Sequence, residues 1–286
     1  MALSSDYREI IASIKNNKTP CEVHGLSESQ KAYVSFCLFE DFNNQMLFLT
    51  YNDLEAKKVY DDLKMFTDDC FYFPVNEMVF NIDVTSGDIK TKRLNVIKKL
   101  IEKEKIIVIA SIDSLFYRMP PSNIFKQEII NISEGSSVDI MTLASKLIDC
   151  GYERVDVVEG KGQFAQRGGI IDIFSPVEED PFRIEFFGDE VDTIRIFDVI
   201  NQRSQRKVSD ITVFPAREMI INSMRILEGQ DKIKYDFEVK YKQYYKKNPE
   251  VAEKLKKRVE SNIEKLSNFR YFEGIDSYVT YFYQKT

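Results

Sequence analysis

The sequence predicts an α/β protein built from a parallel-sheet domain and a β-rich α+β module. Three observations favour this fold class. The chain has 286 residues, a length that suits about two domains. Short apolar runs alternate with amphipathic helical patterns through residue 149, which is typical of βαβ units with a parallel sheet. From Tyr152 onward the pattern changes to strand-length runs separated by turns.

The first 149 residues contain the expected parallel sheet. Met46–Thr50 is an apolar run that predicts a buried strand, and a second strand at 70–73 ends at Pro74, which cannot donate to a sheet ladder. The other elements expected in this part are a helix at 54–66, a helix at 89–103, a strand at 106–110 and a helix at 138–150.

The β-rich module is expected at residues 150–216 and begins with a tight hairpin. Strands at 163–167 and 170–174 flank Gly168-Gly169, a dipeptide that suits a two-residue turn because glycine tolerates positive φ. Two further strands are expected at 182–187 and 191–197, joined by a turn at Gly188-Asp189.

Residues 217–286 complete the chain. The sequence predicts charged helix from Pro215 to Phe269, followed by an aromatic, strand-like segment at 274–283. Since no closing element follows that segment, we expect the chain to be a piece of a longer protein.

Composition and charge limit the function. The hydrophobic share of 43% and charged share of 30% are those of a soluble globular protein, and we expect it in the cytoplasm, without membrane contact. The four scattered cysteines favour reduced thiols over a zinc site, and no cofactor or metal is expected. With a net charge of −6 and a pI near 5.2, the chain lacks the basic character of a dedicated nucleic-acid binder.

Gly25–Ala32 partly matches a phosphate-binding loop, G-x-x-x-x-G-K-[ST]. Gly25 and Lys31 are at the correct spacing, but Gln30 replaces the second glycine and Ala32 replaces the hydroxyl that binds Mg²⁺. We expect this segment to lie between a first strand and a helix, as a degenerate P-loop that no longer binds nucleotide. No catalytic residue is assigned, and this domain is not expected to act as an enzyme.

The strand at 182–187 has an unusual outer face. Because side chains alternate along a strand, one set faces the core and the other faces outward. The core set is Phe182, Ile184 and Phe186, and the outward set is Arg183, Glu185 and Phe187. Arg167 could lie on the same side. An aromatic beside charged residues is typical of interface hot spots. The pattern fits equally well an alternative in which Arg183 and Glu185 form surface ion pairs with neighbouring strands and Phe187 packs under the rest of the chain.

Residues 151–218 resemble the UvrA-binding domain shared by the excision-repair protein UvrB and the bacterial transcription-repair coupling factors (Mfd). The resemblance rests mainly on Phe164–Gly168, Ile171–Phe174, Arg183–Phe187 and Phe214–Glu218. It implies that residues 1–149 and 217–286 form one discontinuous UvrB-like domain, a degenerate ATPase, with residues 150–216 inserted and the last part returning to pack on the first.

The resemblance also implies a function. The module would bind UvrA and so recruit nucleotide excision repair to RNA polymerase stalled at DNA damage. In the family, the positions that contact UvrA correspond to Arg167, Arg183, Phe187 and, in the UvrB pattern, Glu185. A full-length parent would add RNA polymerase binding, double-stranded DNA binding and an ATP-dependent translocase.

Two other hypotheses stay open on the sequence. The chain could be a fragment of an ATP-dependent UvrB-type DNA-repair helicase with residual nucleotide or DNA binding. The broken loop at Gly25–Ala32 favours the coupling factors, and the stretch from Tyr72 to Asp88 is too short for the β-hairpin with which UvrB clamps DNA. The third hypothesis is a DNA-binding module based on lysines in 240–265, although their alternation with glutamates is more typical of a solvated helix face.

Overall fold

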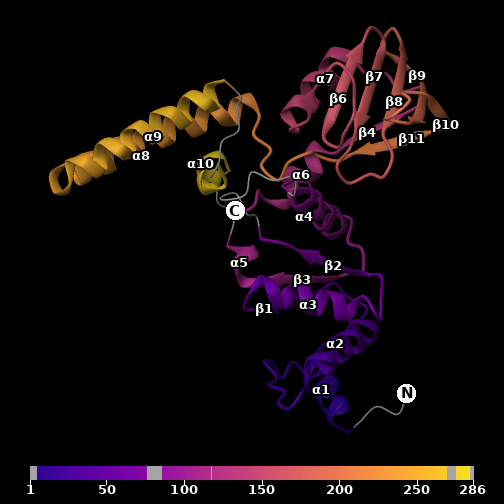
Figure 1. Ribbon diagram of the computed structural model, residues 1–286, viewed down its shortest axis with the longest axis vertical. Helices are drawn as coiled ribbons and strands as arrows, with labels where there is room; N and C mark the ends of the chain where they lie inside the picture. Colours follow the sequence, from indigo (N-terminus) through magenta and orange to yellow (C-terminus); the bar gives the residue numbers. More distant parts are fainter. Residues whose placement is uncertain (1–4, 76–85, 117, 269–274, 284–286) are drawn as a thin grey trace. The chain divides into compact units, whose positions relative to one another are not determined.

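The computed structural model describes residues 5–75, 86–116, 118–268 and 275–283 (Figure 1). The chain divides into two compact units, Met1–Val75 with Glu102–Leu115, and Asn76–Ile101 with Phe116–Thr286. We refer to them as unit 1 and unit 2 and describe each by itself. Residues 76–85, in the stretch expected to be too short for a DNA clamp, lie outside the described residues.

Unit 1 contains the predicted parallel sheet, a three-stranded sheet in the order β1-β3-β2. Its core lies between the sheet and helices α2 and α3, where Ala32, Phe39, Val59 and Ile109 are buried together. The elements of unit 1 are α1 (Ser5–Lys15), α2 (Glu28–Phe42), β1 (Met46–Thr50), α3 (Asp53–Leu63), β2 (Cys70–Phe73), β3 (Ile107–Ser111) and α5 (Ile112–Leu115).

Unit 2 contains the β-rich module, whose largest sheet has six strands in the order β10-β9-β8-β7-β6-β5. The predicted hairpin is confirmed, because β6 and β7 pair antiparallel around Gly168-Gly169 and Gly168 has a φ of +58°. The strands are β5 (Glu153–Arg154), β6 (Gln163–Arg167), β7 (Ile170–Phe174), β8 (Phe182–Phe187), β9 (Glu190–Phe197) and β10 (Ser204–Val208).

The core of the module begins earlier in the chain than residue 150. β4 (Ile130–Ser133) pairs antiparallel with β11 (Asp210–Val213), and both strands pack with α7 (Ile140–Asp149) and one face of the six-stranded sheet. The fully buried members of this core include Leu147, Phe164, Ile171, Ile184 and Ile194. The structured module thus includes residues 130–149, which the sequence assigned to the first domain.

Two ion pairs connect α4 (Ser86–Ile101) to other parts of unit 2. The Arg93 side chain is completely buried, and its Nε and Nη2 donate to the Glu218 carboxylate over 2.6 and 2.8 Å. Lys98 Nζ lies 2.7 Å from Glu178 Oε1, in the connection between β7 and β8. α4 therefore belongs to unit 2, whereas the sequence pattern placed it among the βαβ units. That residues 217–286 return to residues 1–149 stays a prediction.

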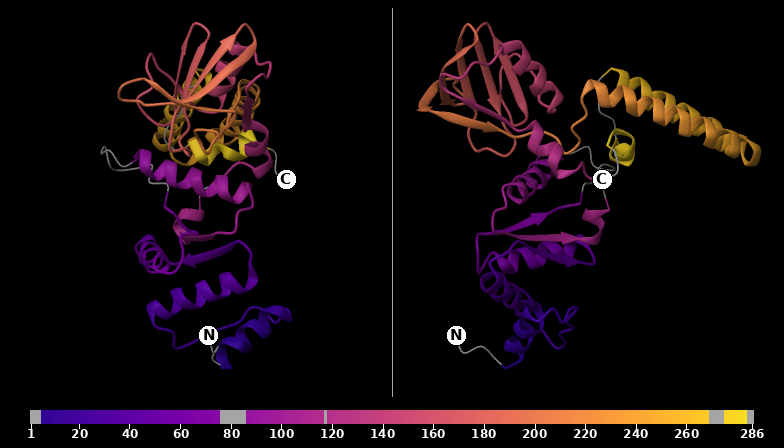
Figure 2. Two further views of the ribbon diagram at one scale, coloured as in Figure 1. Left: turned by 90° about the vertical axis from the view of Figure 1, so that its right-hand side faces the viewer. Right: turned by 180° about the vertical axis from the view of Figure 1, so that it is seen from behind.

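The last part of unit 2 is helical. α8 (Ser223–Lys247) and α9 (Pro249–Ser267) form a long hairpin (Figure 2), as the charged helical pattern predicted. The hairpin turns at Asn248, whose side chain accepts a hydrogen bond from the Val251 N–H and so caps α9. A short helix, α6 (Ser122–Glu128), precedes β4.

The prediction of a strand at 274–283 is wrong. Its described residues form a 3₁₀ turn, η1 (Ile275–Tyr278), and a helical turn, α10 (Val279–Phe282). Ile275, Val279 and Phe282 have the spacing of a helix face and are buried against α8. A Cβ at Gly229 of α8 would lie only 2.5 Å from a ring carbon of Phe282, so glycine makes this close packing possible.

In the described part of the chain, no helix combines the length and apolar character needed to cross a membrane. The same residues contain no group of three or more His, Cys, Asp or Glu arranged to hold a metal ion.

Candidate docking face on the β-rich module

The register of β7, β8 and β9 brings the predicted site residues to one face of the sheet. Asp172 pairs with Arg183 across β7 and β8, and Ile170 pairs with Glu185. Since directly paired residues share a face, Arg183 and Glu185 lie on the same side as Asp172. The Arg167 side chain reaches this side as well, because it is bonded to Asp172. We call this surface, with Phe187 at its end, the docking face.

A buried carboxylate organises the docking face. The Asp172 side chain is 1% exposed and accepts hydrogen bonds from two arginines. Arg183 donates to it through Nε at 2.7 Å and Nη2 at 2.9 Å, and Arg167 donates through Nη2 at 2.6 Å. The hydrogen bonds to Asp172 raise the pKa of Arg183, so the guanidinium stays charged despite its burial.

Sequence reasoning did not assign a role to Asp172. The signal available was a single carboxylate within the apolar strand 170–174. A charge in such a position is uncommon unless it is paired, and an arginine on the next strand was the available partner. The structure shows that Arg183 pairs with Asp172 on the neighbouring strand β7, as the alternative interpretation of the sequence expected for Arg183.

Arg183 is less accessible than the sequence predicted. Its side chain is 14% exposed, and its guanidinium lies 4.8 Å from the centre of the Phe197 ring. Nη1 donates a third hydrogen bond, to the backbone oxygen of Gln202 over 3.0 Å. The sequence placed Arg183 outward on an exposed face, but most of its donors are used inside the module, so truncating it is expected to destabilise the module.

Phe187 and Arg167 are the parts of the docking face that solvent reaches most readily. Phe187 is 83% exposed, and the Arg167 side chain is 48% exposed. Glu185 is half-buried and accepts a 3.1 Å hydrogen bond from Thr193 Oγ1. A β-bulge between Glu185 and Phe186 shifts the pairing with β9, and Phe186 packs against the module core. The exposed aromatic of the sequence prediction is therefore present, at the turn that joins β8 to β9.

In the degenerate loop, each residue that departs from the phosphate-binding pattern has a structural role. The Ser27 N–H donates to Gln30 Oε1 over 2.9 Å, which forms a capping box at the start of α2. Lys31 Nζ is 2.8 Å from Glu28 Oε1, and Ala32 is fully buried in the unit 1 core. Gly25 has a φ of +82° and precedes the helix.

The prediction that a strand precedes this loop is wrong. Within residues 5–27 the structure contains α1 and a connection but no strand, so Gly25 does not follow a first strand. A phosphate loop needs the strand-to-helix turn because that geometry aims backbone N–H groups at the phosphates. That Gly25, Gln30, Lys31 and Ala32 do not bind nucleotide stays a prediction.

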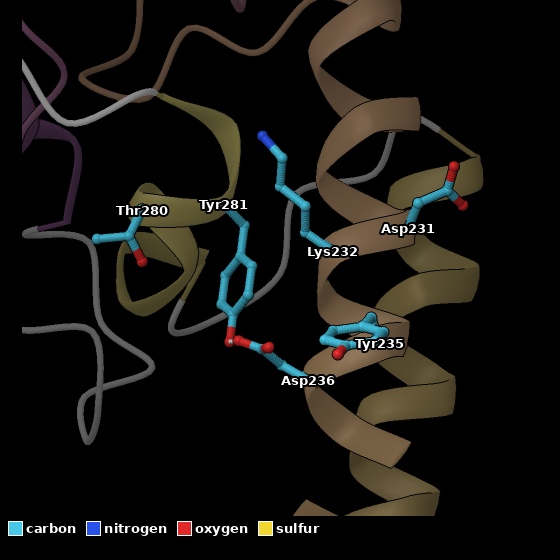
Figure 3. A pocket seen from close by; sticks show the side chains of 6 residues that line it. All are labelled: Asp231, Lys232, Tyr235, Asp236, Thr280 and Tyr281. Atoms are coloured by element: carbon cyan, nitrogen blue, oxygen red, sulfur yellow. Dashed lines mark hydrogen bonds between the residues drawn. The ribbon is translucent and has the colours of Figure 1, made fainter. Parts of the chain in front are cut away.

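A separate pocket of about 490 Å³ lies beside α8 and α10 (Figure 3). Tyr281 points toward Asp236, and its hydroxyl donates to Asp236 Oδ2 over 3.0 Å. This hydrogen bond occupies the two polar groups that face each other in the pocket. The lining residues are Asp231, Lys232, Tyr235, Asp236, Thr280 and Tyr281, and none of them was predicted as a site residue.

Comparison with protein families finds a match over the module. Residues 130–219 match the UvrB interaction domain. The match begins at β4 and contains the whole docking face, so its limits agree with the structured core rather than with the boundary at residue 150.

Curated relatives extend the similarity along the chain. The chain is 33% identical to the transcription-repair-coupling factor of Bacillus subtilis (strain 168), over 99% of this chain and 24% of that protein. It is 30% identical to the protein of the same name from Staphylococcus epidermidis (strain ATCC 12228), over 88% of this chain and 21% of the relative. For Staphylococcus aureus (strain NCTC 8325) the identity is 32%, over 76% of this chain and 19% of the relative. The chain thus spans about a quarter or less of these relatives.

Proposed function

Because this chain is homologous to the transcription-repair-coupling factors and contains a UvrB interaction domain, we propose that it is a non-catalytic docking region that binds UvrA. Through this contact it would recruit nucleotide excision repair to RNA polymerase stalled at DNA damage, in the cytoplasm. The observation that carries the proposal is the exposed Phe187 beside Arg167 and Glu185, within the residues that match the family.

The composition of the docking face suits protein recognition. Aromatic and arginine side chains supply most of the binding energy in many interfaces, because they bury a large area and form charge-assisted hydrogen bonds. Here Phe187 offers its ring to a partner, and Arg167 keeps donors available beyond its bond to Asp172. Since Asp172 fixes the face before binding, a partner would lose little free energy in ordering it.

The activities of the whole coupling factor are part of the same proposal. Binding to RNA polymerase and to double-stranded DNA, together with ATP-driven translocation, would reside in the longer parent protein. This region would serve as its adaptor. The capping role of Gln30, the Lys31–Glu28 pair and the buried Ala32 support an adaptor without nucleotide chemistry.

Calorimetric titration of the chain with purified UvrA tests the proposal. Phe187→Ala is expected to weaken binding at least tenfold, since truncating a hot spot costs about 2 kcal/mol. Its thermal melt should not change, because the side chain is 83% exposed. Arg167→Ala should also weaken binding.

Tyr235→Ala is the matched control, since Tyr235 is an aromatic residue on α8 that is 70% exposed. It should bind UvrA like the original chain. Full binding by both Phe187→Ala and Arg167→Ala would disprove the proposed function, as would the absence of UvrA binding by the unmodified chain.

A further inference from the structure

Strands β9 and β10, labelled in Figure 1, are joined by a loop at residues 198–203. Ile200 at its tip is 92% exposed, more than any other exposed large hydrophobic residue in the described part of the chain. A lone exposed aliphatic side chain is common on protein surfaces and alone carries little meaning. Ile200 differs because a hydrogen bond from Arg183 joins the loop that holds it to the docking face.

Hydrogen bonds within the loop fix its shape. Asp198 Oδ1 accepts from the N–H groups of Ile200 and Asn201, over 2.8 and 3.0 Å. The Gln202 N–H donates to the Asp198 backbone oxygen over 2.8 Å. Arg203 N–H donates to Asn201 Oδ1 over 2.9 Å. With its backbone donors satisfied in this way, the loop holds Ile200 in one position, and binding through Ile200 would require little further ordering.

Gln202 anchors the loop to the rest of the module. Its backbone has a φ of +59°, a conformation that non-glycine residues rarely adopt. Its side-chain Nε2 donates to the Val158 oxygen over 3.1 Å and to the Val199 oxygen over 2.8 Å. Its own backbone oxygen accepts the third hydrogen bond of Arg183. One guanidinium therefore joins the loop to Asp172.

Ile200 and Phe187 lie near opposite ends of β9. Phe187 pairs with Glu190 at the start of β9, and the Ile200 loop follows Phe197 at the end of the same strand. A strand of this length separates its ends by about 25 Å at about 3.3 Å per residue. An interface of about 800 Å² per partner is roughly 30 Å across, so one partner could cover both side chains.

We propose that Ile200 is a second apolar anchor for UvrA, and that Arg183 acts as a positioning residue that holds the Ile200 loop. This inference rests on the proposed function. UvrA would then offer an apolar pocket for a branched aliphatic side chain at the Ile200 loop, and carboxylates near the half-exposed Arg167. Arg183, at 14% exposure, would act mainly through the loop it supports.

The first test measures UvrA affinity of Ile200→Ser by calorimetric titration. Burying an isoleucine contributes about 1.5–3 kcal/mol, so the variant should bind about tenfold to a hundredfold more weakly. Its melting temperature should stay unchanged. Met65→Ser is the matched control, because Met65 is 82% exposed in unit 1 and outside the face. It should bind like the original chain.

The second test is a double-mutant cycle between Ile200→Ser and Arg183→Lys. Lysine keeps the charge but cannot bond Asp172 and Gln202 together. If Arg183 acts by positioning Ile200, the double variant should lose much less affinity than the two single losses combined. Gln202→Ala keeps the backbone oxygen that Arg183 bonds but removes the Nε2 bonds to Val158 and Val199, so it loosens the loop without touching Asp172. It should show coupling to Ile200→Ser even if Arg183→Lys is too unstable. Independent, fully additive losses would overturn the positioning role.

Phe187→Ala distinguishes a failure of the second anchor from a failure of the proposed function. If Phe187→Ala loses UvrA binding while Ile200→Ser binds like the original chain, the second anchor is disproved and the proposed function stands. If the unmodified chain does not bind UvrA, the proposed function itself fails. Loss of binding in both variants, with Met65→Ser unaffected, supports both.

Discussion

Asp172 and Glu28 both hold basic side chains, but in opposite settings. Asp172 lies inside a sheet, 1% exposed, and accepts hydrogen bonds from two arginines. Glu28 lies in the first turn of α2 and meets Lys31 at the surface, where the two side chains are 68% and 45% exposed. Water already solvates the second pair, whereas the first pair has exchanged water for fixed partners. Only the buried pair, at Asp172, can hold the side chains around it in a fixed arrangement.

Asp172→Ala is the strongest test of this difference. The change leaves the Arg183 guanidinium buried without its counter-ion, and removing one partner of a buried pair costs about 3–5 kcal/mol. The free energy of unfolding, from urea denaturation of the module signal, should fall by that amount. Asp180→Ala is the control, since Asp180 is 53% exposed and lies 4.0 Å from Arg206. Equal stability of the two variants would show that Asp172 does not organise the face.

The reactivity of two buried cysteines can show which unit Asp172→Ala destabilises. Cys150 belongs to the module core and Cys70 to the unit 1 core. Asp172→Ala should bring Cys150 into reaction with a thiol reagent at a lower urea concentration than in the original chain, with Cys70 unchanged. Mass spectrometry of the labelled peptides checks this, with the exposed Cys21 as the reagent control. A parallel shift of Cys70 would mean that the two units unfold together.

Alkaline pH should weaken both cores through the same thiols. Burial raises the pKa of Cys70 from 9.0 to about 11 and that of Cys150 from 9.0 to about 12. The folded state thus holds these protons more tightly than the unfolded state. The resulting stability is fully present below pH 9 and is lost as the pH rises through about 11 and then 12. Unfolding curves at pH 8 and 10.5 should differ less in a Cys70→Ala, Cys150→Ala variant than in the original chain.

Lys31→Ala should have the smallest effect. The Lys31–Glu28 pair is on the helix surface, and such pairs contribute little to stability. The thermal melt should stay the same, and titration of the original chain with Mg-ATP should produce no binding heat. A saturable heat that Lys31→Ala removes would instead favour the UvrB-type helicase hypothesis.

Local patterns predicted much of the fold. The strands at 163–167, 170–174 and 182–187 follow from period-two alternation and the Gly168-Gly169 turn, and the structure gives the same bounds. At 275–282 the aromatic and β-branched residues suggested a strand, but packing against α8 selected a helix. Propensity is a weak guide where a short segment gains its stability from tertiary contacts.

The sequence predicted the position of the candidate site but not the contacts that hold its residues in place. Alternation identified the face of Arg183, yet the partner of Arg183 depends on strand register, which a single strand does not reveal. The third bond of Arg183, to Gln202, depends on a loop conformation with positive φ. At Gly25–Ala32 the sequence did contain the competing signal, since Ser27 and Gln30 have the spacing of a capping box.

The pairing of β4 with β11 has a mechanical consequence. Ile130, where β4 begins, is opposite Val213, where β11 ends, so the chain enters and leaves the module at the same end of one antiparallel ladder. A tension applied through these two connections would load the hydrogen bonds one after another, because they run perpendicular to the strands. The module is therefore expected to peel open from Ile130 and Val213 at low force, although its equilibrium stability rests on the large core behind them.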